Sequence, residues 1–284
     1  MKILITGLGG FTGRYLQSEL VTHGHAVVGL MSDLTNAEAL AAEIQQVQPD
    51  WVVHLAGISF VGHLEADDFY RVNLIGTRHL LAALDACGKK PSCVLLASSA
   101  NVYGNRRGRL LSEGTQPAPA NDYALSKLAM EQMARMWLDK LPIVIARPFN
   151  YTGRGQSLDF IVPKLVGHFV QRASAVELGN LDVEREFNDV RSVVQVYHRL
   201  LEACPVGETV NVCSGRYYSL RKIMGIAEAI TGHRLHVEVN PAYVRANEVR
   251  KLYGNPAKLQ RLIGELKMQP LEETLRWMLE DSKV

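Results

Sequence analysis

The chain has 284 residues, of which 47% are hydrophobic and 21% charged, and its formal net charge at pH 7 is +2. This length and apolar content suffice for one large domain or two small ones with a buried core. The charge balance argues against a nucleic-acid-binding protein, because no Lys/Arg run is long enough to follow a phosphate backbone.

The cysteines and the apolar runs indicate a reduced, cytoplasmic protein. The four cysteines show no Cys-x-x-Cys spacing, so we expect small core residues with free thiols and no metal centre. No apolar run reaches membrane-spanning length, and Met1 leads directly into a predicted strand. We therefore expect neither a membrane anchor nor a signal peptide.

A strand, a glycine-rich turn and a helix open the chain. Residues 2–6 form a short apolar run typical of a strand buried on both faces, and a helical pattern follows the turn. Glycines here allow a tight turn and a close approach of the backbone to a pyrophosphate, which the helix N-terminus then faces. We predict dinucleotide binding, with contacts from Gly7, Gly10, Phe11, Thr12 and Arg14 and close packing at Gly13.

The second predicted strand, residues 26–31, leaves the choice between NADH and NADPH open. Such a strand usually ends in an acid that hydrogen-bonds the ribose diol, but here the first acid is Asp33, slightly late. Arg14 could instead reach a 2′-phosphate. Asp33 and Leu34 are candidates to lie beside the adenine, and Asp33 could equally cap the helix that follows.

The third predicted strand, residues 51–57, ends in small residues that allow a backbone to pass close to a ligand. The candidates for this contact are Leu55, Ala56 and Gly57. His54 is expected to pack at the end of the strand rather than to catalyse. A helix is predicted over residues 73–87 from the spacing of its apolar positions.

The fourth predicted strand, residues 93–97, delivers Ser98 and Ser99 at its carboxyl end. Open α/β sheets bind ligands at that end, where a hydroxyl can hydrogen-bond a reacting carbonyl. The alternative for both serines is a turn-forming role.

Tyr123 and Lys127 are four residues apart and therefore lie on one face of the next predicted helix. A phenol titrates near pH ~10, and a neighbouring ammonium favours the phenolate. We therefore expect Lys127 to lower the pKa of Tyr123 toward the range in which proton transfer is effective. The alternative is an ordinary solvated helix face.

These motifs occur in an order that resembles a known family. In chain order they are Thr6-Gly7-x-x-Gly10-x-x-Gly13, His54-Leu55-Ala56-Gly57, Asn73-x-x-Gly76-Thr77, Ser99-x-x-x-Tyr103-Gly104, Tyr123-x-x-x-Lys127 and Arg147-x-Phe149-Asn150. Together they resemble the extended short-chain dehydrogenase/reductases (the NAD-dependent epimerase/dehydratase family) that act on nucleotide sugars. Each motif alone is weak, but the ordered set spans essentially the whole chain.

The fold expected for such a chain is a doubly wound α/β Rossmann sheet of about seven parallel strands with a smaller C-terminal α/β substrate-binding part. We expect residues 1–152 to bind NAD(P), with residues 186–213 returning to that domain. Residues 153–284 would form the nucleotide-sugar-binding part.

The resemblance also implies roles for individual residues. Ser99 would orient the sugar oxygen, Tyr123 would carry the proton, and Lys127 would hold the nicotinamide ribose of NADPH or NADH. Further cofactor contacts are implied for Asn73 and Pro148. Substrate contacts are implied for Ser59, Asn101, Asn150, Gln156, Arg185, Arg245 and Glu248.

The substrate is expected to be a GDP-linked 4-keto-6-deoxyhexose. The loop from Asn150 to Gln156 resembles the Asn-x-x-Gly-x-Gly-Gln loop of GDP-4-keto-6-deoxy-D-mannose reductases. Guanidinium groups at Arg185 and Arg245 suit a diphosphate, because each can bond two oxygens at once, and Glu248 could contact guanine or hold Arg245. The product would be GDP-D-rhamnose or the 6-deoxytalose epimer, as in lipopolysaccharide deoxysugar synthesis.

Several alternatives stay open. The chain could be a nucleotide-sugar 4-epimerase, a dTDP-4-keto-6-deoxyhexose reductase, or a non-catalytic nucleotide sensor. Dehydration is disfavoured, because Ala100 and Asn101 stand where dehydratases carry acids. Arg191 stands where the family often has an acidic residue.

A homodimer is also implied, because relatives associate through the helix near residues 73–87 and the Tyr123 helix. The apolar residues Met130, Met133, Met136 and Trp137 could serve that bundle or the monomer core, and we expect a mixture of the two.

Overall fold

The centre of the molecule is a parallel sheet with the strand order β10-β5-β4-β3-β1-β2. Its strands are β1 (Lys2–Thr6), β2 (Ala26–Gly29), β3 (Trp51–His54), β4 (Cys93–Ala97), β5 (Ile143–Pro148) and β10 (Thr209–Val212). The structure is a computed structural model that describes residues 1–284 except 60–64, 107–109, 182, 241–248, 250 and 281–284. The doubly wound α/β fold predicted from the sequence is confirmed, and β10 returns the chain to the large sheet.

This sheet has six strands, where about seven were expected. The chain between β2 and β3 holds one helix, α2 (Ala37–Val47), so β2 remains an edge strand. β2 is also shorter than predicted, because the amides of Met31 and Ser32 donate to the Glu43 carboxylate of α2, at 2.8 and 2.7 Å. These bonds take the backbone out of the sheet.

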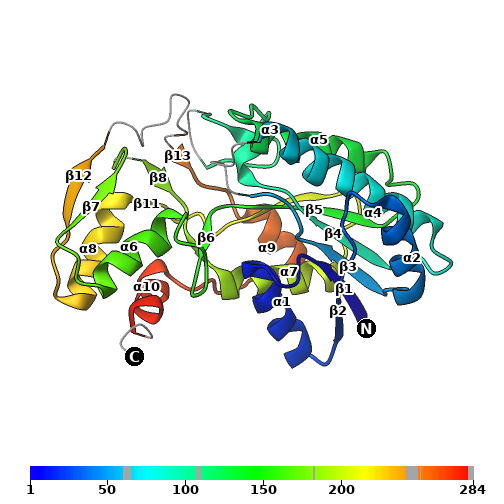
Figure 1. The fold of residues 1–284 in the computed structure, drawn as a ribbon, viewed down its shortest axis with the longest axis horizontal. Coiled ribbons are helices and arrows are strands. Elements are labelled where there is room, and N and C mark those ends of the chain that lie inside the picture. Colours follow the sequence, from blue (N-terminus) through cyan, green and yellow to red (C-terminus); the bar gives the residue numbers. More distant parts are fainter. Residues whose placement is uncertain (60–64, 107–109, 182, 241–248, 250, 281–284) are drawn as a thin grey trace.

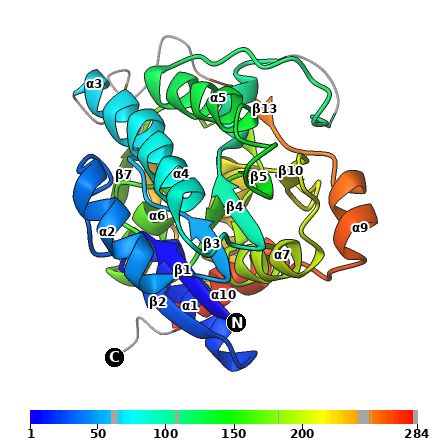
Figure 2. The same ribbon diagram turned by 90° about the vertical axis from the view of Figure 1, so that its right-hand side faces the viewer.

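Helices cover both faces of the sheet (Figures 1 and 2). One face carries α2, α4 (Thr77–Ala86) and α5 (Asp122–Arg135), and the other carries α1 (Phe11–Thr22), α7 (Val190–Ala203) and α9 (Ala257–Ile263). Successive strand side chains point to opposite faces. Ile3 and Ile5 therefore belong to the core beneath α1 and α7, whereas Leu4 belongs to the core beneath α2 and α4.

The helix predicted over residues 73–87 is composite. A short helix α3 (Ala66–Asp68) leads into a π-helix, η1 (Phe69–Gly76), and only then into α4. π-Helical turns are rare and are frequent at functional sites. Here the π-helix carries Asn73, which lies next to the loop after β3. A 3-10 turn, η2 (Ala100–Tyr103), follows β4.

A second, smaller α/β part lies on the left of Figure 1 and has its own apolar core. Its helices are α6 (Ile161–Val170), α8 (Leu220–Thr231) and α10 (Leu271–Glu280). Its short strands are β6 (Tyr151–Thr152), β7 (Ala175–Leu178), β8 (Glu184–Arg185), β9 (Asn188–Asp189), β11 (Tyr218–Ser219), β12 (His236–Val239) and β13 (Lys251–Leu252). The strands pair as β12-β7, β11-β8-β13 and β6-β9.

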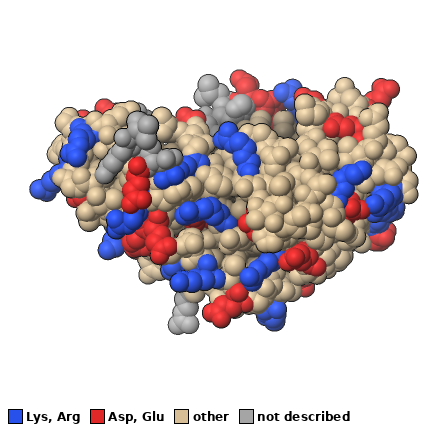
Figure 3. Space-filling view, turned by 90° about the horizontal axis from the view of Figure 1, so that it is seen from below, with Lys and Arg blue, Asp and Glu red and all other residues tan. Residues whose placement is uncertain are grey.

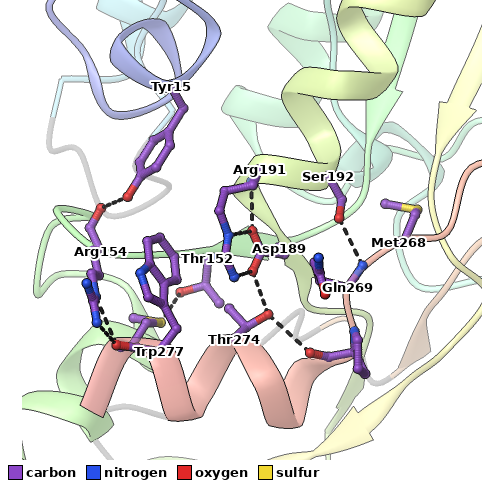
Figure 4. Close-up of polar contacts among 12 residues, drawn as sticks. Tyr15, Thr152, Arg154, Asp189, Arg191, Ser192, Met268, Gln269, Thr274 and Trp277 are labelled. Atoms are coloured by element: carbon purple, nitrogen blue, oxygen red, sulfur yellow. Dashed lines mark hydrogen bonds and ion pairs between the residues drawn. The ribbon is translucent and has the colours of Figure 1, made fainter. Parts of the chain in front are cut away.

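Helix α10 is fastened to the large sheet's helices through Trp277 (Figure 4). The indole lies between two guanidinium groups, at 4.8 Å from Arg154 and 3.8 Å from Arg191. Arg191 also pairs with the buried Asp189, which accepts a 2.8 Å hydrogen bond from Thr274 of α10. The smaller part is therefore held against α7 by cation–π and charge-assisted contacts.

None of the helices in the described ranges is both long and apolar enough to cross a membrane. The face seen from below in Figure 3 carries basic and acidic side chains interspersed, and neither sign covers it continuously.

Candidate active site

The glycine turn lies at the carboxyl end of β1. Gly7 has a φ of +74°, and a Cβ there would lie 2.9 Å from the amide nitrogen of Ala56, while a Cβ at Gly13 would collide with the Gly7 carbonyl oxygen. The N-cap of α1 is Gly10, no side chain among the described residues caps this N-terminus, and the first turn carries no acid. Its free amides and positive dipole end therefore fit a diphosphate.

The loop after β3 is held by Asn73. The Asn73 amide accepts a hydrogen bond from the Ile58 amide at 2.9 Å and donates to the Ile58 carbonyl and the Ser126 hydroxyl, each at 3.1 Å. Asn73 is fully buried, so its side chain positions this loop. Gly57 lies directly over it, because a Cβ there would come within 2.7 Å of Asn73 Oδ1 and 3.3 Å of Lys127 Nζ.

His54 packs at the end of β3, as expected. Its ring nitrogens bond the hydroxyls of Thr6 and Thr77 at 2.7 and 2.8 Å. Burial, with Lys127 nearby, lowers the pKa of His54 to about 3. The ring is therefore a neutral structural link between β1 and α4.

Ser99, Tyr123 and Lys127 meet at the carboxyl end of β4. The Ser99 hydroxyl lies close enough to Tyr123 to influence its pKa, and the Lys127 ammonium donates to the Ala97 carbonyl at 2.9 Å. All three side chains are buried. Asn121 caps the helix that carries Tyr123 and Lys127, accepting from the Ala124 amide at 2.8 Å.

Burial sets the proton affinities of this group. It raises the pKa of Tyr123 to about 12, against the opposing hydrogen bond from Ser99, and lowers the pKa of Lys127 to about 8, against the opposing charge of Glu131. The expectation that Lys127 lowers the pKa of Tyr123 is therefore wrong for this structure. At neutral pH the phenol is protonated and able to donate.

A second polar group lies one helical turn further along α5. Glu131, which the sequence analysis did not single out, is fully buried and binds the Arg147 guanidinium through two bonds of 2.8 and 2.6 Å. Ser98 donates to the same carboxylate. Arg147 also donates to the Tyr103 hydroxyl at 2.9 Å, which in turn donates to Asn211 at 2.7 Å.

Tyr151 joins the glycine turn to the substrate side, and it too was missed. Its ring stacks on Phe11 with centroids 6.1 Å apart, and its hydroxyl bonds Thr12 at 2.8 Å. Burial is the main cause of the raised pKa of Tyr123, and Tyr151 raises it further, so the two phenols are neighbours. These contacts bring Phe11 and Thr12 into one cluster with Tyr123.

The residues near β2 that were predicted to contact NAD(P) do not lie together in one cluster. Asp33 is exposed and its carboxylate binds the Thr35 amide and hydroxyl at 2.7 and 2.8 Å. The N-cap of α2 is Asn36 rather than Asp33. Leu34 packs in the core beside Gly76. The exposed Arg14 reaches the Gly155 carbonyl at 3.4 Å.

The candidate substrate residues are placed around the same edge of the sheet. Asn101 donates to the Ser99 hydroxyl at 3.1 Å, and the Asn150 carbonyl accepts from the Asn188 amide at 2.8 Å. Gln156 donates to the Tyr151 carbonyl at 3.2 Å, which braces the loop.

Three further positions complete this picture. Pro148 ends β5 and is half-buried, Ser59 is exposed after the β3 loop, and the half-buried Arg185 ends β8. Arg245 and Glu248 lie outside the described residues.

Comparison with known proteins places this geometry in a family. The family model of the NAD dependent epimerase/dehydratase family matches residues 3–213. GDP-6-deoxy-D-talose 4-dehydrogenase of Aggregatibacter actinomycetemcomitans is 36% identical, over 93% of this chain and 92% of that relative. GDP-6-deoxy-D-mannose reductase of Pseudomonas aeruginosa is 33% identical, over 99% of this chain and 96% of that relative.

Two solved structures are similar along nearly the whole chain. A Burkholderia cenocepacia protein described as a candidate epimerase has a TM-score of 0.94 and 48% identity, covering 99% of this chain and 98% of its own. RMD from Pseudomonas aeruginosa, solved with NADPH, has a TM-score of 0.90 and 31% identity, covering 99% and 97%. With these relatives and a family model that matches most of its length, the chain belongs to the NAD dependent epimerase/dehydratase family.

Proposed function

We propose that this protein uses NADPH or NADH to reduce the 4-keto group of a GDP-linked 4-keto-6-deoxyhexose. The observation that carries the proposal is that Ser99, Tyr123 and Lys127 are buried together at the carboxyl ends of the sheet strands, where the glycine turn also lies. Two relatives with names in GDP-6-deoxysugar chemistry support the substrate class.

The residues around the glycine turn fit a nicotinamide dinucleotide. The uncapped N-terminus of α1 would hold the diphosphate, with Gly7, Gly10, Phe11 and Thr12 around it. Leu55, Ala56 and Gly57 would line the passage between the turn and Lys127. Asn73 would act by fixing that loop, and Pro148 would border the nicotinamide side.

The adenosine end and the nucleotide sugar would occupy the surrounding residues. We assign Asp33, Leu34 and Arg14 to the adenosine end. Ser59, Asn101, Asn150, Gln156, Arg185, Arg245 and Glu248 are assigned to the nucleotide sugar. In this scheme residues 1–152 and 186–213 carry the cofactor, and residues 153–284 supply the remaining sugar contacts.

The chemistry follows from the three buried side chains. A nicotinamide dinucleotide, when bound, supplies the hydride. Tyr123, protonated at neutral pH, donates its proton to the oxygen on carbon 4, while the Ser99 hydroxyl hydrogen-bonds the same oxygen. The Ser99 hydroxyl, which lowers the pKa of Tyr123 against the effect of burial, would stabilise the phenolate left behind. The pKa of Tyr123 near 12 suits this direction, because an acid must hold its proton until the oxygen becomes basic.

A 4-epimerase is the second candidate, favoured by the 48% identity to the Burkholderia cenocepacia protein. An epimerase would use the same acid/base without net consumption of reduced cofactor. Dehydration is not supported, because Ala100 has no ionisable group and Asn101 is bonded to Ser99.

The test is to incubate the purified protein with GDP-4-keto-6-deoxymannose and NADPH or NADH and follow the reduced-nicotinamide absorbance. Stoichiometric oxidation is expected, and NMR of the product then separates a rhamno from a talo configuration at carbon 4. Interconversion of two GDP-sugars without cofactor loss would instead establish the epimerase. Thermal shifts with GDP, UDP, dTDP and CDP identify the nucleotide, with GDP expected to give the largest shift.

We also propose a cytoplasmic homodimer that serves deoxysugar synthesis, such as that of lipopolysaccharide O-antigen. Apolar side chains remain exposed on the two helices through which relatives are expected to associate, namely Ile75, Leu125 and Met136. Met130 is buried and Met136 is 75% exposed, which agrees with the expectation that these apolar residues serve both the monomer core and the dimer interface. A monomeric mass by light scattering would refute the dimer.

A further inference from the structure

Three imidazoles and a carboxylate gather near the amino ends of the sheet strands. The glycine turn lies at the opposite, carboxyl ends. Glu19 lies near the end of α1 and His23 caps it, while His25 enters β2 and His198 lies on α7. Glu19 and His23 are four residues apart and so lie on the same helical face, which lets one helix offer two ligands to one ion.

The spacing of the ligand atoms suits a tetrahedral metal ion. Glu19 Oε1 lies 3.5 Å from Nδ1 of His23 and 3.5 Å from Nδ1 of His198. One ligand atom from each of the three residues lies within 4.8 Å of the other two. Ligands held about 2.0–2.2 Å from one zinc ion are about 3.3–3.6 Å apart, so these separations need little adjustment.

Two imidazoles of the cluster are poorly satisfied, whereas His23 Nδ1 bonds the Glu19 carbonyl oxygen at 2.8 Å, a bond that metal ligation through Nδ1 would replace. The His198 side chain is only 5% exposed, and its ring centroid lies 4.4 Å from that of His23 and 5.3 Å from that of His25. His198 Nε2 faces His25 Nε2 at 3.3 Å, and one proton can serve only one of them as donor. His25 Nδ1 is buried without a hydrogen-bond partner in the described part of the chain.

We propose that Glu19, His23 and His198 bind a divalent transition-metal ion of the zinc type, which ties α1 to α7. Imidazole nitrogens with a carboxylate are a donor set that such ions prefer. Glu202, 3.7 Å from His198 Nε2, is placed to orient that ring, as carboxylates do for metal-bound histidines. The half-exposed His23 leaves solvent access for the ion and for a water ligand.

Calorimetric titration of the tag-free, chelator-treated full chain with zinc chloride tests the proposal. We expect one ion per chain, and at least tenfold weaker binding in His23→Gln and in His198→Asn. His236 is an exposed histidine on β12, so His236→Gln is the matched control and should bind zinc as the wild type does. Zinc should also raise the melting temperature of the wild type and of the control.

His23→Gln keeps the test decisive if the buried variant fails to fold, because His23 is half exposed. If zinc raises the melting temperature of the wild type and of His236→Gln but not that of His23→Gln, the result supports the site. The proposal is overturned if the wild type takes up no zinc, or if His23→Gln binds zinc as tightly as His236→Gln does.

Discussion

Helix α5 carries two buried polar groups one turn apart, and they are built differently. The Glu131 carboxylate accepts two hydrogen bonds from the Arg147 guanidinium and a third from the Ser98 hydroxyl. Lys127 is also buried, but among the described residues its ammonium has one hydrogen bond, to the Ala97 carbonyl, and Tyr123 has the Ser99 hydroxyl as a neighbour.

The difference is visible in the proton affinities. Burial shifts the pKa of Lys127 down and that of Tyr123 up, because neither group has a full counter-charge. Arg147 keeps a raised pKa despite its burial, because Glu131 and Tyr103 are bonded to it. A buried group with few protein partners is a candidate for chemistry, whereas a fully paired group stabilises the fold.

The largest effect should follow from breaking the paired group. Glu131→Leu leaves the Arg147 charge buried and unpaired, so the free energy of unfolding should fall by about 3–5 kcal/mol. The double variant Glu131→Leu/Arg147→Met removes both charges and should recover most of that loss. Denaturant unfolding of the three proteins measures both values, and a double variant less stable than Glu131→Leu would contradict the pairing.

Two adjacent serines offer the next comparison. Ser99→Ala removes the hydroxyl aimed at the reacting oxygen and should lower kcat by about 10²–10³-fold, with little change in stability. Ser98→Ala removes one donor to Glu131 and should cost about 1 kcal/mol of stability while turnover stays near wild type. Equal kinetic losses in the two variants would remove the distinction between the two groups.

Lys127 should make stability depend on pH. Its pKa of about 8 in the folded chain lies below the ordinary 10.5, so between these values the unfolded chain binds more protons and stability rises with pH. Relative to Lys127→Met, the wild type should gain about 3 kcal/mol as pH increases from about 8 to 10.5. Unfolding curves across that range measure the gain, and a difference independent of pH would refute it.

The smallest effect concerns a third buried phenol. The Tyr197 hydroxyl on α7 has no hydrogen-bond partner within the described ranges. Tyr197→Phe should therefore leave turnover unchanged and raise the free energy of unfolding by about 1 kcal/mol or less. A clear loss of stability or activity in this variant would show that the hydroxyl has a role.

Much of the fold was predictable because its signals are local. An apolar run followed by glycines places β1, the turn and α1, and helical spacing places Tyr123 above Lys127. The length of β2 was not predictable, since it depends on the Glu43 carboxylate reaching back from α2.

The proximity of Tyr123 and Lys127 was predictable from their spacing, but their proton affinities were not. Glu131 was missed, because its role depends on Arg147, which lies 16 residues away in the sequence and meets it only in the folded chain. The direction of the pKa shift of Tyr123 depends on how deeply its side chain is buried, and the sequence alone does not show this. Tyr151 was missed because its contact with Thr12 joins positions 139 residues apart.

One pair of isosteric variants tests the contrast between the two groups most directly. Tyr123→Phe and Tyr103→Phe each remove one buried phenolic hydroxyl, the first from the partly satisfied group and the second from the paired group. We predict that Tyr123→Phe lowers kcat by about 10²–10⁴-fold and leaves the stability unchanged. Tyr103→Phe should keep turnover but lose about 1–3 kcal/mol, because Arg147 and Asn211 lose a partner. Wild-type turnover by Tyr123→Phe would contradict the account.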